Sequence, residues 1–134
     1  MFTLTLKPIA RTYSNNGQHA EQVLRYTLTN EITKADNKPH TDGADVGDIQ
    51  IKSARATVCN GLDINKYLET DKAKRFAYII KDFTLAYIMS KKEYIEFVNE
   101  FGTVTRDSKA NGGKKKIRLK SESKKMIEWL TRNA

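Results

Sequence analysis

The sequence predicts a mixed α/β (α+β) fold, a central mixed β-sheet flanked by helices, and three observations predict it. Apolar residues alternate with polar ones over residues 2–6, which is typical of a half-buried strand. Two apolar runs, 76–80 and 83–89, flank a short polar turn and indicate a β-hairpin near the middle of the sheet. Apolar residues at helical spacing indicate helices over 18–33 and 90–101. Helices and strands in this order favour helices packed on a sheet.

The middle of the chain supplies a further strand and a short helix. Ile49 and Ile51 alternate with polar residues, so we expect them on a core face, with Asp48, Gln50 and Lys52 on the other face. The alternation shifts phase after Lys52 and continues through residue 58, which indicates a bulge or bend. A helix is expected over 62–70.

The C-terminal third predicts a capped helix, a hairpin and a last helix. Ser90 and Glu93 form a capping-box pattern at the start of the helix that Gly102 ends. Residues 103–106 and 115–120 can pair as a hairpin, and residues 121–132 have the pattern of a helix. Trp129, the single tryptophan, is expected to hold that helix on the sheet.

Length and composition indicate one soluble domain spanning 1–134. The chain has 134 residues, of which 39% are hydrophobic and 30% charged, as in ordinary globular proteins. The sequence has neither an apolar run long enough to cross a membrane nor the pattern of a signal peptide, so we expect a cytoplasmic protein that does not bind membranes. Its one cysteine, Cys59, excludes an intramolecular disulfide and a cysteine zinc cluster, and is expected in the core.

The net charge of +8 is concentrated near the C-terminus. Residues 106–134 carry ten Lys and Arg against three Asp and Glu. Such a one-sided basic segment is typical of proteins that bind a phosphate backbone, whereas an acidic membrane surface or plain solvation are the alternatives. The candidate nucleic-acid contacts are cations of the C-terminal hairpin together with two residues that follow Lys52: Lys114, Lys115, Lys116, Arg118, Lys120, Ser53 and Arg55.

The acidic segment 42–53 contains groups suited to phosphodiester hydrolysis. Asp42, Asp45 and Asp48 are followed by Gln50 and Lys52. Carboxylate and amide oxygens are ligands for Mg²⁺, with Mn²⁺ as an alternative. A bound metal activates water, and an ammonium can orient the nucleophile or stabilise the transition state. The segment therefore predicts a metal site beside a lysine.

In these residues the sequence resembles the PD-(D/E)XK nuclease superfamily of restriction endonucleases, resolvases and mismatch-repair nicking enzymes. Gln50-Ile51-Lys52 is similar to the family's acid-X-Lys triplet, and Asp45 is the best match to its leading acid, with Asp42 as second choice. Ala44 stands where the family has proline, and Gln50 replaces the usual carboxylate, as in Gln-X-Lys variants. The resemblance covers about residues 17–58 and implies a restriction-endonuclease-like core with the motif strands in the middle of the sheet.

The resemblance also implies roles for individual residues. The family often carries a metal-binding glutamate on the helix before the hairpin, and Glu21 lies at the border of that helix's apolar stripe, whereas His19 lies away from it. Glu21 and Asp45 would then bind Mg²⁺, Gln50 would add an oxygen ligand, and Lys52 would position or activate water. Asp48 is a further candidate ligand. His40, in the preceding loop, is expected to be solvated.

Three functions remain open from the sequence. The first is a metal-dependent DNA endonuclease, with RNA as an alternative substrate, of the small solitary kind that the resemblance associates with phages and mobile elements. A single such chain would nick DNA, recognise branches or ends, or form a homodimer to cut both strands. The second is a non-catalytic nucleic-acid-binding module that uses the basic C-terminal segment, 103–134. The third is a regulatory protein that binds another protein.

Overall fold

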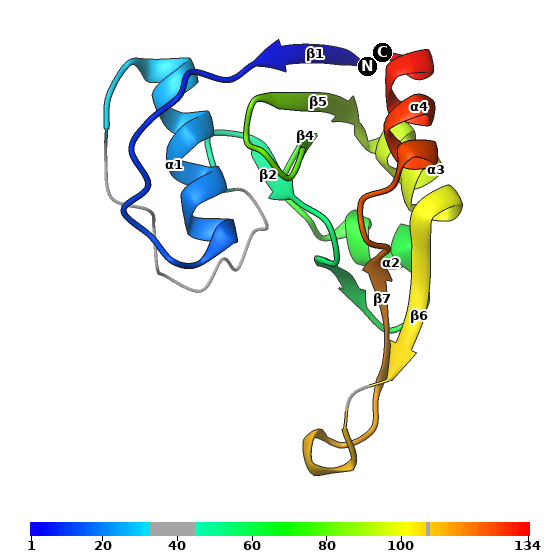
Figure 1. Ribbon diagram of the computed structural model, residues 1–134. Coiled ribbons are helices and arrows are strands. Elements are labelled where there is room, and N and C mark those ends of the chain that lie inside the picture. Colours follow the sequence, from blue (N-terminus) through cyan, green and yellow to red (C-terminus); the bar gives the residue numbers. More distant parts are fainter. Residues whose placement is uncertain (33–44, 107) are drawn as a thin grey trace.

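The computed structural model describes residues 1–32, 45–106 and 108–134, and these form an α+β fold of two β-sheets and four α-helices (Figure 1). This confirms the predicted fold class, with two sheets in place of the expected single one. The elements, in chain order, are β1 (Phe2–Thr5), α1 (Asn16–Thr29), β2 (Ile49–Lys52), β3 (Thr57–Asn60), α2 (Ile64–Glu69), β4 (Arg75–Ile79), β5 (Leu85–Ser90), α3 (Lys91–Phe101), β6 (Gly102–Arg106), the 3₁₀ turn η1 (Lys109–Asn111), β7 (Lys115–Leu119) and α4 (Lys124–Asn133).

The larger sheet has four strands in the order β1-β5-β4-β2. β4 and β5 form the expected antiparallel hairpin at its centre, and β1 pairs antiparallel with β5. β2 pairs in parallel with β4, so that Gln50 lies opposite Phe76 and Lys52 opposite Tyr78. Among the described strands, the motif strand β2 is therefore at one end of the sheet, and its expected position in the middle is wrong.

The smaller sheet has the order β3-β7-β6, and the expected hairpin of β6 and β7 is present. The chain leaves the larger sheet after Lys52 and enters the smaller one at Thr57, by a turn in which the Ala56 amide donates to the Ser53 carbonyl across 3.2 Å. The predicted bend after Lys52 is thus a change of sheet. β6 runs away from the helices and β7 returns toward them, and the turn η1 between these strands lies farthest from the larger sheet (Figure 1).

Hydrophobic residues cover both faces of the larger sheet. Along β4, Ala77 and Ile79 pack in a cluster with Ala20, Val23 and Leu24 of α1. The alternating residues Phe76 and Tyr78 pack in a second cluster, which α2, α3 and α4 cover. Because strand side chains alternate, Ile49 joins the α1 cluster, as predicted, and Gln50 lies on the opposite face. That opposite face is also packed, so only 8% of Gln50 is exposed.

Helix α1 is shorter than expected, and its buried surface extends beyond the predicted apolar stripe. It begins after Asn15, whose side chain accepts from the Gln18 amide, and ends before Asn30, which adopts a left-handed conformation. His19, which the sequence places away from the apolar stripe, is 5% exposed because its ring packs edge-on against Phe83 at 4.7 Å. The predicted helix end at residue 33 is therefore wrong, since the helix ends at Thr29, and His19 is buried although it lies away from the predicted apolar stripe.

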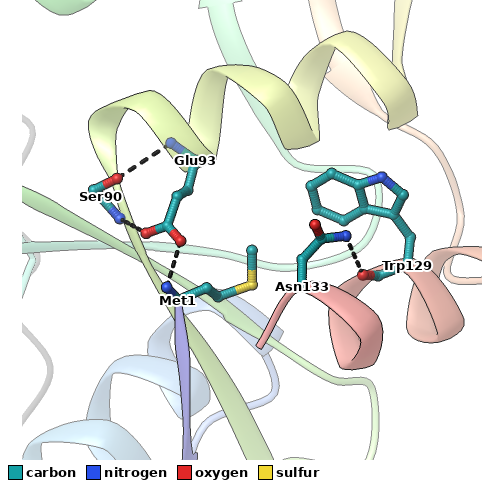
Figure 2. A network of polar contacts seen from close by, with 5 residues as sticks. All are labelled: Met1, Ser90, Glu93, Trp129 and Asn133. Atoms are coloured by element: carbon teal, nitrogen blue, oxygen red, sulfur yellow. Dashed lines mark hydrogen bonds and ion pairs between the residues drawn. The ribbon is translucent and has the colours of Figure 1, made fainter.

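The helices on the other face are held by caps and aromatic contacts. Ser90 and Glu93 form the predicted capping box, and the Met1 ammonium pairs with Glu93 (Figure 2). Trp129 lies with its ring centroid 5.8 Å from those of both Phe97 and Phe101 of α3, so it anchors α4 on that helix, whereas the sequence predicted a contact with the sheet. The Trp129 carbonyl also accepts from Asn133 Nδ2 across 2.7 Å (Figure 2). In the described part of the chain, none of the helices has the length and apolarity needed to cross a membrane.

Candidate functional site

A pocket of about 270 Å³ opens between the N-terminus of α1 and the end of β2. Three of the predicted catalytic residues, Glu21, Asp45 and Lys52, line it, together with Ser53 and the first residues of α1. The N-terminal end of a helix carries partial positive charge, which favours anions such as phosphate. The pocket therefore combines two carboxylates, one lysine and a helix N-terminus.

Asp45 is held against the strand that carries the lysine. Its Oδ2 accepts from the Ile51 amide across 2.7 Å, and its own amide donates to the Ile49 carbonyl across 2.8 Å. Gly47 takes a φ of +57° in the turn between these residues, a conformation that glycine adopts without strain. The chain therefore makes a tight turn between Asp45 and Gln50, and this turn places the Asp45 carboxylate beside β2.

Glu21 reaches the same pocket from α1. Only 5% of the residue is exposed, although it is an acid on the border of the apolar stripe. Arg25, one helical turn later, places Nη2 3.8 Å from Glu21 Oε1 and donates from the same nitrogen to the Asp45 carbonyl across 3.0 Å. Arg25 therefore connects α1 to the segment that bears Asp45.

Lys52 is the cation of the pocket. Its Nζ donates to the Thr57 carbonyl across 2.8 Å, which directs the side chain along the turn between the two sheets. Burial lowers the pKa of Lys52, and the negative charges of Asp45 and Asp71 oppose that change. A lysine with a lowered pKa exchanges protons more readily near neutral pH than an exposed one.

Gln50 and Asp48 are not among the residues that line the pocket. Gln50 lies on the α2 and α3 side of β2, where its side chain is hydrogen-bonded to Tyr67 of α2. Burial raises the pKa of Tyr67, and this hydrogen bond opposes that rise. Gln50 Oε1 is buried without a hydrogen-bond partner among the described residues. Asp48 instead accepts two hydrogen bonds from Arg75 Nε and one of 2.8 Å from Arg75 Nη2, which hold the pKa of the carboxyl below its usual range. The structure thus brings neither residue to Glu21 and Asp45.

The candidate nucleic-acid contacts lie on two connected segments. Ser53 lines the pocket and Arg55 is exposed beside it. On β7, Lys116 and Arg118 point to one face of the strand, while Ile117 and Leu119 pack toward the core. Arg118 donates from Nε to the Arg55 carbonyl across 3.0 Å, so part of its side chain supports the turn. The exposed Lys114, Lys115 and Lys120 continue the basic segment.

Glu21 and Asp45 supply carboxylate oxygens of the kind that Mg²⁺ takes as ligands. Mg²⁺ is commonly bound by one or two carboxylates, with waters and substrate phosphates completing its shell. The two acids offer oxygen ligands only, and they line the pocket together with the first residues of α1, a helix end that favours anions such as phosphate. Within residues 1–32, 45–106 and 108–134, no three His, Cys, Asp or Glu side chains gather into a metal site. Asp42, the alternative leading acid, and His40 lie outside the described residues.

Sequence reasoning missed Arg25 and the helix N-terminus at the pocket. The i, i+4 spacing of Glu21 and Arg25 on one helix was an available signal, since such pairs meet on a helix surface. The approach of α1 to the end of β2 depends on tertiary packing, for which the sequence holds no local signal. The chain matches no protein-family model, no curated protein and no solved structure.

Proposed function

We propose that this protein is a metal-dependent endonuclease that hydrolyses DNA phosphodiester bonds. The observation that carries the proposal is that Glu21, Asp45 and Lys52, from two separate elements, line one pocket. Packing alone does not explain why two acids and a lysine lie together in this pocket, because each ionised group loses hydration when it is buried. The cytoplasm, where such an enzyme meets DNA, is part of the proposal.

In this mechanism Glu21 and Asp45 hold the metal through their carboxylates. A bound Mg²⁺ or Mn²⁺ would supply an activated water and offset the charge that develops on the phosphate. The hydrogen bond from the Ile51 amide to Asp45 Oδ2 fixes one carboxylate, and Arg25 fixes the backbone behind it. The acids therefore need little reorganisation when the substrate binds, which favours catalysis.

Lys52 orients the attacking water or donates to a phosphate oxygen in the transition state. Its lowered pKa, caused by burial, also suits it to moving a proton. Gln50 and Asp48 have no part in this mechanism, since they do not line the pocket. The ligand set is accordingly smaller than the resemblance implies, with two acids in place of three oxygen-bearing side chains.

The basic segment of the smaller sheet would bind the DNA backbone outside the pocket. Lys114, Lys115 and Lys120 are exposed, and Lys116 and Arg118 point to the face of β7 away from the core. Cations along an extended strand can follow successive phosphates without reading bases. A chain of this size would nick DNA, act on branches or ends, or pair with a second copy to cut both strands.

The test is cleavage of supercoiled and branched DNA with Mg²⁺ or Mn²⁺, with EDTA as a control. Wild type should nick or cut, whereas Glu21→Gln, Asp45→Asn and Lys52→Met should each lose at least about a hundredfold in rate, the scale of removing one metal ligand or general catalyst. Two exposed residues of α3 give matched controls: Glu96→Gln and Lys92→Ala remove the same charges far from the pocket and should cut normally.

A second outcome would favour the non-catalytic DNA-binding module. If wild type binds DNA without cutting it, and the three pocket variants bind equally well, the nuclease proposal fails. Loss of binding in a variant without Lys114, Lys115 and Lys116 would then assign the function to the basic segment. A wild type that does not bind DNA at any salt concentration would favour a protein partner instead.

A further inference from the structure

The turn that joins the two sheets places an arginine where glycine is usual. Residues 53–56 form a turn closed by the bond from the Ala56 amide to the Ser53 carbonyl, and Arg55 is its third residue with a φ of +65°. In type II turns this position requires a positive φ and is ordinarily occupied by glycine or asparagine. A bulky residue there is strained, because its Cβ crowds the backbone in that conformation.

Packing or capping accounts for the other described non-glycine residues with positive φ. Asn30 is the C-cap of α1, and its amide donates to the Tyr26 carbonyl across 2.8 Å. Phe83 is half-buried, with its ring 4.7 Å from His19 and under the Arg11 guanidinium at 5.6 Å. Arg55 differs, because its side chain is exposed and forms no hydrogen bond or ion pair with any described residue.

Strand β7 and the residue that follows it hold the backbone of Arg55 in this conformation. The Arg55 carbonyl accepts from Arg118 Nε across 3.0 Å, and its amide donates to the Lys120 carbonyl across 3.4 Å. The next amide contact, from Leu119 to the Ala56 carbonyl, measures 2.9 Å. The turn is therefore fixed on both sides, and the guanidinium is presented from a rigid base rather than from a loose loop.

The position of Arg55 suggests what its side chain binds. Ser53 and Ala56, on either side of it in the turn, both line the pocket. Arg118 of β7 and Lys120, the residue after that strand, both hydrogen-bond to the Arg55 backbone. A rigidly presented arginine fork suits a phosphate group, which it can bind through two parallel hydrogen bonds.

We propose that Arg55 binds the DNA phosphate next to the one in the pocket, and so leads the substrate backbone from the catalytic acids to the basic strand β7. The identity of the substrate rests on the proposed nuclease function. In this arrangement a glycine at position 55 would relieve the strain but would have no guanidinium to bind the phosphate. This explains why a strained arginine stands at this position. Arg118 has two roles, since it supports the turn and adds positive charge next to it.

The test measures DNA binding in EDTA at several salt concentrations for Arg55→Gly, Arg55→Ala and Arg55→Lys. Loss of one phosphate contact should reduce the slope of log affinity against log salt by about one in Arg55→Gly and Arg55→Ala, whereas Arg55→Lys should keep most of it. Thermal unfolding separates strain from charge: Arg55→Gly should have a Tm at or above that of Arg55→Ala, because only glycine relieves the positive φ. Lys92→Ala, on α3, removes one exposed charge elsewhere and should change the slope by much less.

Three outcomes are distinguishable. A folded Arg55→Gly variant with weaker, less salt-dependent binding supports the proposal, whether or not the wild type cuts DNA. Wild-type affinity and salt slope in Arg55→Gly and Arg55→Ala, in a protein that does cut DNA, would overturn the role of Arg55 and leave the nuclease intact. A wild type that binds DNA through Arg55 but never cuts it, even with Mn²⁺, would instead overturn the nuclease alone.

Discussion

The Arg25 guanidinium donates from Nη2 to the main-chain carbonyl of Asp45 across 3.0 Å, and the same nitrogen lies 3.8 Å from Glu21 Oε1. One side chain thus contacts both segments that supply the acids of the pocket. Its guanidinium is partly buried, and hydrogen bonds from charged donors contribute about 1.5 to 3 kcal/mol.

Replacement of Arg25 should therefore affect both stability and metal binding. Arg25→Ala should lower the free energy of unfolding by about 1 to 3 kcal/mol in urea titrations, because the Asp45 carbonyl loses its donor. It should also weaken Mn²⁺ binding, measured by calorimetry, since Asp45 is no longer aligned with Glu21. Arg25→Lys keeps the charge and should restore part of both. Unchanged Mn²⁺ affinity in Arg25→Ala would contradict this positioning role.

Asp48→Asn should separate the acids that bind metal from those that do not. The three hydrogen bonds from Arg75 hold the pKa of Asp48 low, so its contribution to stability is complete above the ordinary aspartate value and is lost as pH falls through the lowered pKa. The pair is largely exposed, so the variant should lose at most about 1 kcal/mol at pH 7 and nothing once Asp48 is protonated in acid. Mn²⁺ affinity should stay at the wild-type value, and a drop of tenfold or more would make Asp48 a ligand after all.

Gln50→Glu should not improve the enzyme, although it restores the carboxylate that the resemblance leads one to expect. Gln50 is 8% exposed and lies beside Tyr67, so the substitution places an acid in a packed region outside the pocket. Burial raises the pKa of a carboxyl, and the folded state then loses stability as pH rises above the ordinary glutamate value. We expect a loss of about 1 to 3 kcal/mol at pH 7 and no gain in cleavage. A faster enzyme with tighter Mn²⁺ binding would place residue 50 in the metal site.

The same residues show how far the sequence could predict the site. Alternation in β2 correctly separates Ile49 from Gln50, because side chains of a strand alternate whatever the surrounding fold. It does not reveal that both faces are covered, or that α1 and its Glu21 lie on the face opposite Gln50. Those facts depend on the order of strands in the sheet, which is a long-range property. Arg55 was recognisable as a cation, but its positive φ depends on contacts with β7, more than sixty residues later.

The capping box of α3 could be predicted because it is local, and it gives a direct stability test. Ser90 accepts from the Glu93 amide while the Glu93 carboxylate accepts from the Ser90 amide (Figure 2). Ser90→Ala should therefore lower the free energy of unfolding by about 1 kcal/mol. Lys92→Ala, between them on the exposed side, should stay within about 0.5 kcal/mol of wild type. Equal stability of Ser90→Ala and wild type would show that the Met1 and Glu93 pair alone holds this helix end.

The lowered pKa of Lys52 predicts a stability difference that depends on pH. Because burial lowers its pKa in the folded state, the unfolded chain binds more protons between that lowered pKa and the ordinary lysine value of 10.5. The free energy of unfolding of wild type should therefore rise relative to Lys52→Met as pH increases through this window, and level off above it. Urea titrations of both proteins in EDTA, from pH 7 to 10.5, measure the difference without any contribution from metal. A difference that stays constant over the range would mean that Lys52 is as well hydrated in the folded protein as in the unfolded chain.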